Sequence, residues 1–255
     1  MPNPLFARDD YILLSNDDGF FAPGLKLLEK IVKEQSDYAI FAPNVNRSGA
    51  SSALSLQNPI TITAVEDNIF AVVGTPADCV HVALNGLVEH IPKKVLTGIN
   101  AGANLGDDVL YSGTVAAALE ARFLPTSNIA FSITNHHPKH WETAEYAVRE
   151  VLKRTADLSL PQRTILNVNI PDVSLDELKG FRITRLGQRT QSDDLHELIN
   201  PRGTCNYWIG LSGNHCKDDD QGTDFQAIAE GYVSITPIHV DMTQFAVMDQ
   251  VSELF

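Results

Sequence analysis

The stretch YILLSNDDGFFAPGLKLLEKIV, residues 11–32, decides the fold class. A short apolar run over residues 11–15 ends in the polar loop NDDG. Pro23 suits the first turn of a helix, and the apolar residues after it follow helical spacing. The next run, residues 38–42, is apolar without alternation, which is typical of a parallel strand covered on both faces. The chain therefore opens as a strand–helix–strand unit.

The same alternation continues through most of the chain. Further strands are predicted at residues 60–65, 69–73, 95–99, 129–133 and 165–168, and helices at residues 75–84, 114–122 and 142–156. Strands that alternate with helices predict an α/β fold with an open, mostly parallel sheet. From about residue 181 the pattern changes to shorter strands and Gly-rich turns, followed by a strand at 232–236 and an apolar helical tail. We therefore predict a core of residues 1–180 and a continuous appendage of residues 181–255.

Composition and charge limit the function classes. Of the 255 residues, 44% are hydrophobic and 20% are charged, which excludes disordered and fibrous proteins. The 19 Lys and Arg against 32 Asp and Glu give a net charge of −13, which disfavours a protein that coats nucleic acid. A small phosphate ester needs a local positive field here, supplied by a metal ion, a helix N-terminus or backbone N–H groups.

Cysteine usage and hydropathy predict a soluble, cytoplasmic protein. The three cysteines, Cys79, Cys205 and Cys216, have no CxxC spacing, so we expect neither a zinc site nor a disulfide framework. No run of about 18 apolar residues occurs, so we expect no membrane insertion. The first ten residues do not read as an export signal.

Polar residues gather where three of the predicted strands end. Asp17 and Asp18 follow the first strand, Ser48 follows the second, and Asn100 follows the strand at 95–99. In open α/β sheets, ligands bind beyond the carboxyl ends of the strands. Two adjacent carboxylates resist burial unless a cation compensates them or water solvates them. Hard oxygen donors without His or Cys suit Mg²⁺ or Mn²⁺. The alternative is a tight turn in which Asp18 caps the following helix.

A glycine-rich loop precedes the Ala-rich helix. The segment TGINAGANLG, residues 97–106, matches neither the GxGxxG dinucleotide fingerprint nor the GxxxxGK[ST] phosphate loop. Ser112, Gly113 and Thr114 then enter the helix, where N–H groups and hydroxyls can hold an anion. The alternative is that Ser112 or Thr114 simply caps the helix.

Two further polar clusters carry weaker signals. In the segment HHPKH, residues 136–140, the proline interrupts helical pairing of histidines, so a solvated loop is favoured over a metal site. The acidic residues 218–220 lack the spacing of an EF-hand loop and are interpreted as a solvated turn.

Several separated motifs occur in the order found in one protein family. They are ILLSNDDGFFAPGL (12–25), NRSGAS (46–51), TGINAGANLGDDVLYSGTVAAALEA (97–121), NVNIP (167–171), RLGQR (185–189), NPRG (200–203) and GTDFQAIAEGYVSITPI (222–238). Together they resemble the SurE family, the stationary-phase survival proteins. The resemblance spans nearly the whole chain.

The resemblance implies a Rossmann-like three-layer α/β sandwich and a metal-dependent nucleotidase. Such an enzyme hydrolyses nucleoside 5′- and 3′-monophosphates, and some members also act on short polyphosphate. One divalent ion per subunit, Mg²⁺ or Mn²⁺, is expected on the family's ligand positions, which match Asp17, Asp18, Ser48 and Asn100. The phosphate-holding positions match Asn104, Ser112, Gly113 and Thr114.

The resemblance also suggests roles beyond ligand binding. We expect Asp17 and Asp18 to be catalytic, with Asp17 as the carboxylate that assists the attacking water and Asn16 in a supporting hydrogen-bonding role. The C-terminal elements are expected to exchange between subunits of a homodimer or homotetramer. The rival interpretation is a non-catalytic regulatory module that binds nucleotide or phosphate without hydrolysing it.

Overall fold

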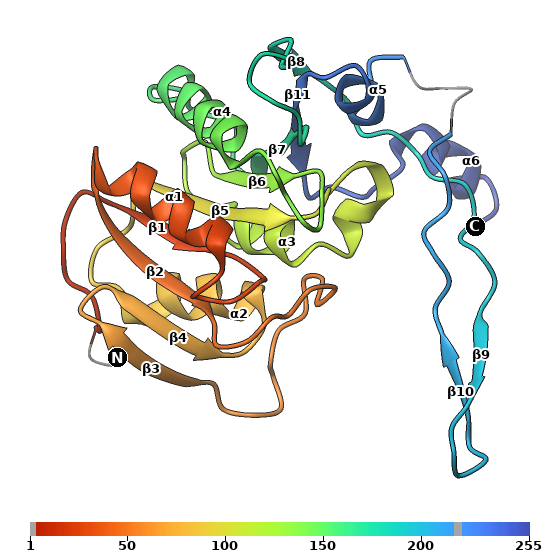
Figure 1. Cartoon of the computed structure of the whole chain (residues 1–255), viewed down its shortest axis with the longest axis horizontal. Coiled ribbons are helices and arrows are strands. Elements are labelled where there is room, and N and C mark those ends of the chain that lie inside the picture. The colour runs from red at the N-terminus through yellow and green to blue at the C-terminus, as the bar shows by residue number, and fades with distance from the viewer. Residues whose placement is uncertain (1–3, 217–220) are drawn as a thin grey trace.

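A mostly parallel sheet forms the centre of the molecule in a computed structural model that describes residues 4–216 and 221–255 (Figure 1). Within these residues, nine strands lie in the order β3-β4-β2-β1-β5-β6-β7-β11-β8. Their bounds are β1 (Tyr11–Ser15), β2 (Asp37–Pro43), β3 (Thr61–Glu66), β4 (Ile69–Val73), β5 (Lys94–Ala101), β6 (Ile129–Ile133), β7 (Thr164–Ile170), β8 (Phe181–Ile183) and β11 (Val233–His239). The six strands from β4 to β7 are parallel, whereas β3 runs antiparallel to β4 and β11 antiparallel to β7.

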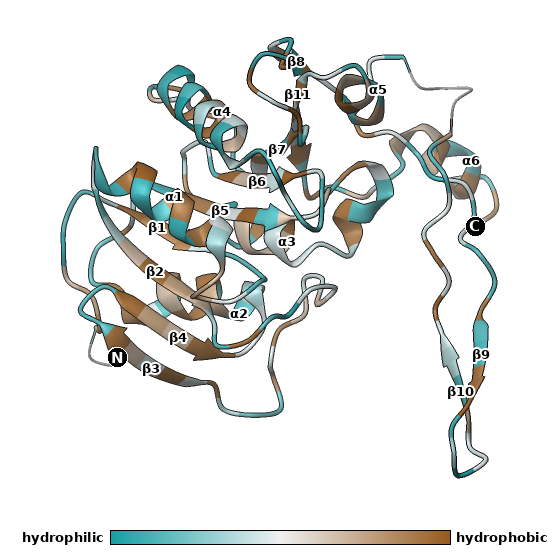
Figure 2. Ribbon diagram, in the orientation of Figure 1, coloured by the Kyte–Doolittle hydropathy of each residue, from teal (hydrophilic) through white to brown (hydrophobic). Residues whose placement is uncertain are grey.

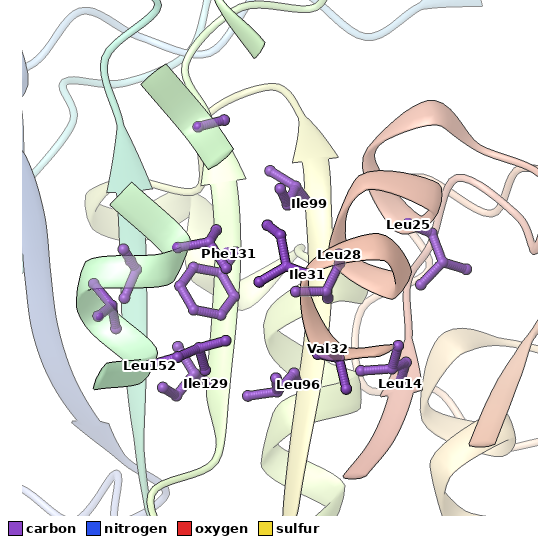
Figure 3. Close-up of a cluster of buried hydrophobic side chains, with 14 of the residues drawn as sticks. Leu14, Leu25, Leu28, Ile31, Val32, Leu96, Ile99, Ile129, Phe131 and Leu152 are labelled. Atoms are coloured by element: carbon purple, nitrogen blue, oxygen red, sulfur yellow. The ribbon is translucent and has the colours of Figure 1, made fainter. Parts of the chain in front are cut away.

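Helices cover both faces of this sheet. Helices α1 (Pro23–Lys33) and α4 (Trp141–Arg154) pack on one face, and α2 (Pro76–Val82) and α3 (Gly113–Glu120) pack on the other (Figure 1). Strand β1 serves both layers, because Ile12 and Leu14 join the α1/α4 side while Tyr11 and Leu13 join the α2/α3 side. Figure 3 shows the first of these clusters, in which apolar side chains of α1 meet those of the strands beneath. The predicted three-layer α/β sandwich is confirmed.

Helix α1 approaches the sheet unusually closely. Its apolar positions Leu25, Leu28 and Ile31 are fully buried, as the helical spacing predicts. A Cβ atom at Gly24 would collide with the backbone carbonyl of Ile99 in β5. Glycine is therefore required at this position, and α1 is held against the strand that carries Asn100.

The strand and helix predictions hold with small shifts at the ends. Strands β1, β4 and β6 have the predicted bounds. Strand β5 is longer than predicted and includes Asn100, which pairs in register with Ser132 of β6. The helix predicted to continue to residue 84 instead changes at Ala83 into a π-helical turn, Ala83–Leu87.

Residues 181–255 contribute both to the main sheet and to an extension. Strands β8 and β11 complete the sheet beside β7, and the short helix α5 (Asp224–Ala229) precedes β11. Strands β9 (His196–Ile199) and β10 (Cys205–Trp208) form an antiparallel hairpin, which we call the arm and which projects away from the body (Figure 1). The division at residue 180 stays a prediction, and the acidic residues 218–220 lie outside the described residues.

The arm and the tail contain hydrophobic residues (Figure 2), and many of these are exposed. Every residue of β9 and β10 is exposed, including Ile199 and Trp208. The tail forms a 3-10 turn, Phe245–Val247, followed by α6 (Met248–Ser252), and it buries none of its residues. The docking of the tail on a partner subunit therefore stays a prediction. No helix among the described residues is long and apolar enough to cross a bilayer.

Candidate active site

The predicted strand ends meet at the switch point of the sheet. Strand β1 lies between β2 and β5, so the chain leaves β1 toward one edge and later returns on the other side of it. Open α/β sheets bind ligands in the crevice at such a point. A cavity of about 830 Å³ lies there, which we call the phosphate cavity. It is lined by the predicted residues Asp17, Ser48, Asn100, Asn104 and Ser112.

Asp17 is a buried carboxylate that lines this cavity. It is only 4% exposed, and its Oδ1 accepts a 2.5 Å hydrogen bond from the Thr114 hydroxyl. Gly113 packs so closely that a Cβ atom there would lie 2.8 Å from the Asp17 Cβ. Burial raises the pKa of the Asp17 carboxyl from 3.8 to about 6, although the Thr114 bond lowers it. The charge of the neighbouring Asp18 raises that pKa further.

Asp18 lies between the phosphate cavity and a second cavity. Its Oδ1 accepts a hydrogen bond from Asn46 at 3.1 Å, and its Oδ2 accepts one from the Ala101 N–H at 3.3 Å. Burial raises the pKa of this carboxyl as well. Asp18 lines the second cavity, which shares Ala101 and His136 with the phosphate cavity. The structure thus groups the other predicted ligands in one cavity and Asp18 in the adjoining one.

The alternative role for Asp18 as a helix cap is wrong. Helix α1 begins at Pro23 after Ala22, whose side chain makes no capping hydrogen bond. The NDDG turn is closed instead by Asn16, whose Oδ1 accepts the Gly19 N–H at 3.2 Å and whose Nδ2 donates to the Gly19 carbonyl at 2.8 Å. Asn16 therefore shapes the turn that presents the two carboxylates.

Ser48 and Asn100 add neutral oxygen atoms to the carboxylates. Ser48 is exposed on the cavity wall, and its N–H donates to Asn46 Oδ1 at 2.8 Å. Asn100 is 9% exposed and donates from Nδ2 to the Gly102 carbonyl at 2.8 Å, which leaves its Oδ1 without a hydrogen bond from any described residue. Carboxylate, hydroxyl and amide oxygens are the hard donors that Mg²⁺ and Mn²⁺ prefer. The chemistry of this donor set fits such an ion.

Three buried side chains on β6 and β7 form hydrogen bonds to Asn104. We call them the amide clamp: Ser132, Asn167 and Asn169. The Asn104 N–H donates to Asn169 Oδ1 at 2.8 Å, and the Asn104 carbonyl accepts from Asn167 and Asn169 at 2.8 and 2.9 Å. The Asn104 Nδ2 donates to Ser132 Oγ at 2.7 Å. All four bonds are buried, so strands β6 and β7 fix the position of the glycine-rich loop.

The three residues that enter α3 have separate roles. Ser112 is the N-cap of α3 and accepts the Val115 N–H at 3.1 Å, so the capping interpretation is correct for this residue. Thr114 is fully buried, and its hydroxyl points to Asp17 rather than into the cavity. Gly113 allows the backbone of the first turn to approach Asp17. The positive end of the α3 dipole therefore lies beside the buried carboxylate.

An ion pair and a hydrogen-bonded carboxylate, both beyond the predicted residues, join this part of the chain to the C-terminal region. Arg189 forms a bidentate pair with Asp108, at 2.8 and 2.5 Å, and also donates to the Gly213 carbonyl at 2.9 Å. Asp224 is fully buried and accepts the N–H groups of Gly106 and Gly187 at 2.7 and 2.9 Å. Sequence reasoning missed both contacts, although Arg189 and Asp224 lie in the RLGQR and GTDFQ motifs.

Fold and site together define an α/β protein of the Rossmann-like type with an acidic, oxygen-rich site at its switch point. The chain belongs to the SurE family: the model of the family described as "Survival protein SurE" matches residues 12–193. It is 48% identical to "5′-nucleotidase SurE" of Methylococcus capsulatus, over 94% of this chain and 95% of that protein. It is 47% identical to "5′-nucleotidase SurE" of Pseudomonas entomophila, over 91% and 93%.

A solved structure supports the same assignment. The crystal structure of SurE protein from Aquifex aeolicus superposes with a TM-score of 0.82 at 37% identity, covering 96% of this chain and 99% of that one. The resemblance inferred from the separated motifs is therefore confirmed, and so is the fold that it implied.

Proposed function

We propose that this protein is a metal-dependent 5′-nucleotidase, which hydrolyses nucleoside 5′-monophosphates to nucleoside and phosphate. The relatives that carry this name match more than nine tenths of the chain. The observation that carries the proposal is the contact between the buried Asp17 carboxylate and the first turn of α3. It places an acidic oxygen beside the N–H groups of a helix N-terminus, and such N–H groups suit a phosphoryl group.

The proposed cofactor is one divalent ion per subunit, Mg²⁺ or Mn²⁺, held by Asp17, Asp18, Ser48 and Asn100. Supporting this set are its oxygen chemistry and the raised pKa values of the two carboxyls, because an ionised buried carboxylate needs a compensating charge. When bound, the ion supplies positive charge against the phosphoryl oxygens of a dianionic ester.

The chain's own residues then orient the ester and move the proton. Asn104, Ser112, Gly113 and Thr114 form the proposed phosphate-holding segment, with the amide clamp fixing Asn104 and the Ser112 cap fixing the start of α3. Thr114 acts on the phosphate indirectly, by holding Asp17. Asp17 Oδ1 accepts the Thr114 bond, and the carboxylate takes the proton of the water that attacks phosphorus in line.

The proposal extends to three finer properties. Nucleoside 3′-monophosphates and short polyphosphate are further substrates, because a cavity of about 830 Å³ has room beyond one phosphoryl group. The protein acts in the cytoplasm. Subunits associate as a homodimer or homotetramer through exchanged C-terminal elements, which is supported by the exposed apolar side chains of the arm and tail.

A phosphate-release panel tests the proposal. Protein stripped of metal is given nucleoside 5′- and 3′-monophosphates and polyphosphate, with and without Mg²⁺ or Mn²⁺. The expected result is metal-dependent release of phosphate from the 5′-monophosphates. Calorimetry on the same samples separates the rival module, because nucleotide binding without phosphate release would contradict the enzyme.

A further inference from the structure

The second cavity beside the site has a different lining from the phosphate cavity. It holds about 530 Å³ and runs from Asp18 to the side chains of Phe21, His136, His137, Pro138 and Trp141. We call it the aromatic cavity. It shares His136 and Ala101 with the phosphate cavity, so the two cavities adjoin at these residues.

The loop before α1 and the start of α4 form two walls of the aromatic cavity. Phe21 lies in the loop between β1 and α1 and is 60% exposed, with its ring edge-on to Phe20 at 5.2 Å between centroids. Trp141 is the first residue of α4 and is half-buried against the core shared by α1 and α4. One wall is thus a ring open to solvent, and the other is anchored in the core.

The loop that carries the histidines is held in place by one carboxylate. Asp172 accepts the N–H groups of Lys139 and His140 at 3.0 and 2.9 Å and the side-chain amide of Asn135 at 2.7 Å. His136 lies at the boundary of the two cavities, with Nδ1 3.2 Å from the Ala101 carbonyl. Its ring packs against Gly102, where a Cβ atom would lie 2.8 Å from the His136 Cε1.

The two cavities suit different parts of a nucleotide. The phosphate cavity has oxygen and amide groups near Asp17, and its cationic side chain, Arg189, is already paired with Asp108. The aromatic cavity offers flat, apolar rings beside Asp18, the next residue in the chain. A nucleobase needs such a surface, and aromatic side chains stack on any base because every base has a π-face.

We propose that the aromatic cavity binds the nucleobase of a nucleoside monophosphate whose phosphoryl group lies in the phosphate cavity. Trp141 and Phe21 are its stacking surfaces, and His136 lies where the sugar passes between the cavities. The side-chain amide of Asn46 also lines this cavity, but it already bonds to Asp18 and to the Ser48 N–H. Stacking therefore dominates over reading of a base edge, and the site accepts purines and pyrimidines alike. The inference rests on the proposed function, since it assigns a subsite to the same substrate.

Fluorescence tests the site without depending on turnover. The chain has two tryptophans, and Trp208 lies in the arm, so Trp208→Phe leaves Trp141 as the sole reporter. Adding AMP to metal-free Trp208→Phe protein is expected to quench its emission, whereas ribose 5-phosphate leaves the emission unchanged. Equal quenching by both compounds, or none by either at concentrations where calorimetry shows AMP bound, overturns the proposal.

Kinetics provides the second arm. The readout is kcat/KM for AMP divided by kcat/KM for ribose 5-phosphate, a ratio that reports what the base contributes. Trp141→Leu and Phe21→Ala are each expected to lower this ratio about 5- to 100-fold, and Trp141→Phe to restore most of it. Tyr111→Ala is the matched control, because Tyr111 is a similarly exposed aromatic residue, 68% exposed, in the phosphate cavity.

The outcomes separate the two proposals. If Tyr111→Ala lowers the ratio and Trp141→Leu does not, the base lies in the phosphate cavity and the inference is wrong. If wild-type protein hydrolyses neither compound while AMP still quenches Trp141, the proposed function fails and the nucleobase site stands. Thermal unfolding of each variant shows whether the half-buried Trp141 was removed without loss of the fold.

Discussion

The hydroxyl of Thr114 donates a 2.5 Å hydrogen bond to Asp17 Oδ1, and it joins the first turn of α3 to the end of β1. The two residues are 97 positions apart in the chain, and both are buried. This bond orients the carboxylate. It also lowers the pKa of Asp17, which opposes the increase that burial causes. The consequences of breaking it are measurable.

Thr114→Val removes the hydroxyl and keeps the shape of the side chain. We expect kcat/KM for AMP to fall about 10- to 100-fold, because a carboxylate without its orienting partner binds metal and proton less well. Thr114→Ser, which restores a donor, is expected to recover most of the activity. A Val variant as active as wild type at neutral pH would show that the bond is unimportant.

Asp17→Asn should lose most of its activity and keep its fold. We expect hydrolysis to fall about 10²- to 10⁴-fold, because the amide cannot accept the proton. Its Oδ1 can still accept the Thr114 bond, so the fold and the oligomeric state should persist. Phosphate release and light scattering check these two expectations, and wild-type turnover would exclude the proposed role.

The Asp17 carboxyl should destabilise the metal-free fold as the pH rises. The pKa of Asp17 is about 6 in the folded chain against 3.8 ordinarily, so the folded state binds the proton more tightly. The resulting stability is fully present below pH 4 and is lost as the pH rises through about 6, a change of about 3 kcal/mol. Urea unfolding in EDTA at pH 4 and pH 8 measures it, and Asp17→Asn is expected to lack this component.

Metal removal should abolish hydrolysis reversibly. EDTA is expected to stop phosphate release, and Mg²⁺ or Mn²⁺ to restore it together with a higher Tm, because an ion that binds the folded state stabilises it. Asp18→Asn, which lowers the charge of the donor set by one, should require a higher metal concentration for half-maximal rescue. Undiminished hydrolysis in EDTA would contradict the proposed cofactor.

The amide clamp should matter for both folding and substrate binding. Asn169→Leu leaves the N–H of Asn104 buried without its acceptor, and we expect unfolding free energy to fall by about 1–3 kcal/mol. Because the same bond positions the glycine-rich loop, KM for AMP should rise as well. Val168→Ala in the same strand is the control, since it destabilises the core without touching Asn104. Equal effects of both variants on KM would argue against positioning.

The sequence predicts the sheet well because each buried parallel strand is a short apolar run. The strand-end rule likewise predicts correctly that Asp17, Ser48 and Asn100 line one cavity. The sequence does not predict which cavity Asp18 lines. In a turn, the direction of a side chain depends on partners that are remote in the chain, such as Asn46, 28 positions from Asp18.

The contacts that sequence reasoning missed join residues that are remote along the chain. Asn169 lies 65 positions from Asn104, Arg189 lies 81 from Asp108, and Asp224 lies 118 from Gly106. Local spacing does not indicate such pairs. For the contact with Asn104 there is a signal, the alternation of Asn167 and Asn169, which places two amides on the same face of β7.

The buried Asp224 makes the glycine-rich loop depend on a late part of the chain. During translation, the proposed metal-ligand and phosphate-holding residues all emerge before residue 115, but Gly106 lacks its anchor until the ribosome has released residue 224. A nascent chain that stalls before this point would carry the two carboxylates beside an unfastened loop. On the proposed function, copies that end before residue 224 would be poor catalysts.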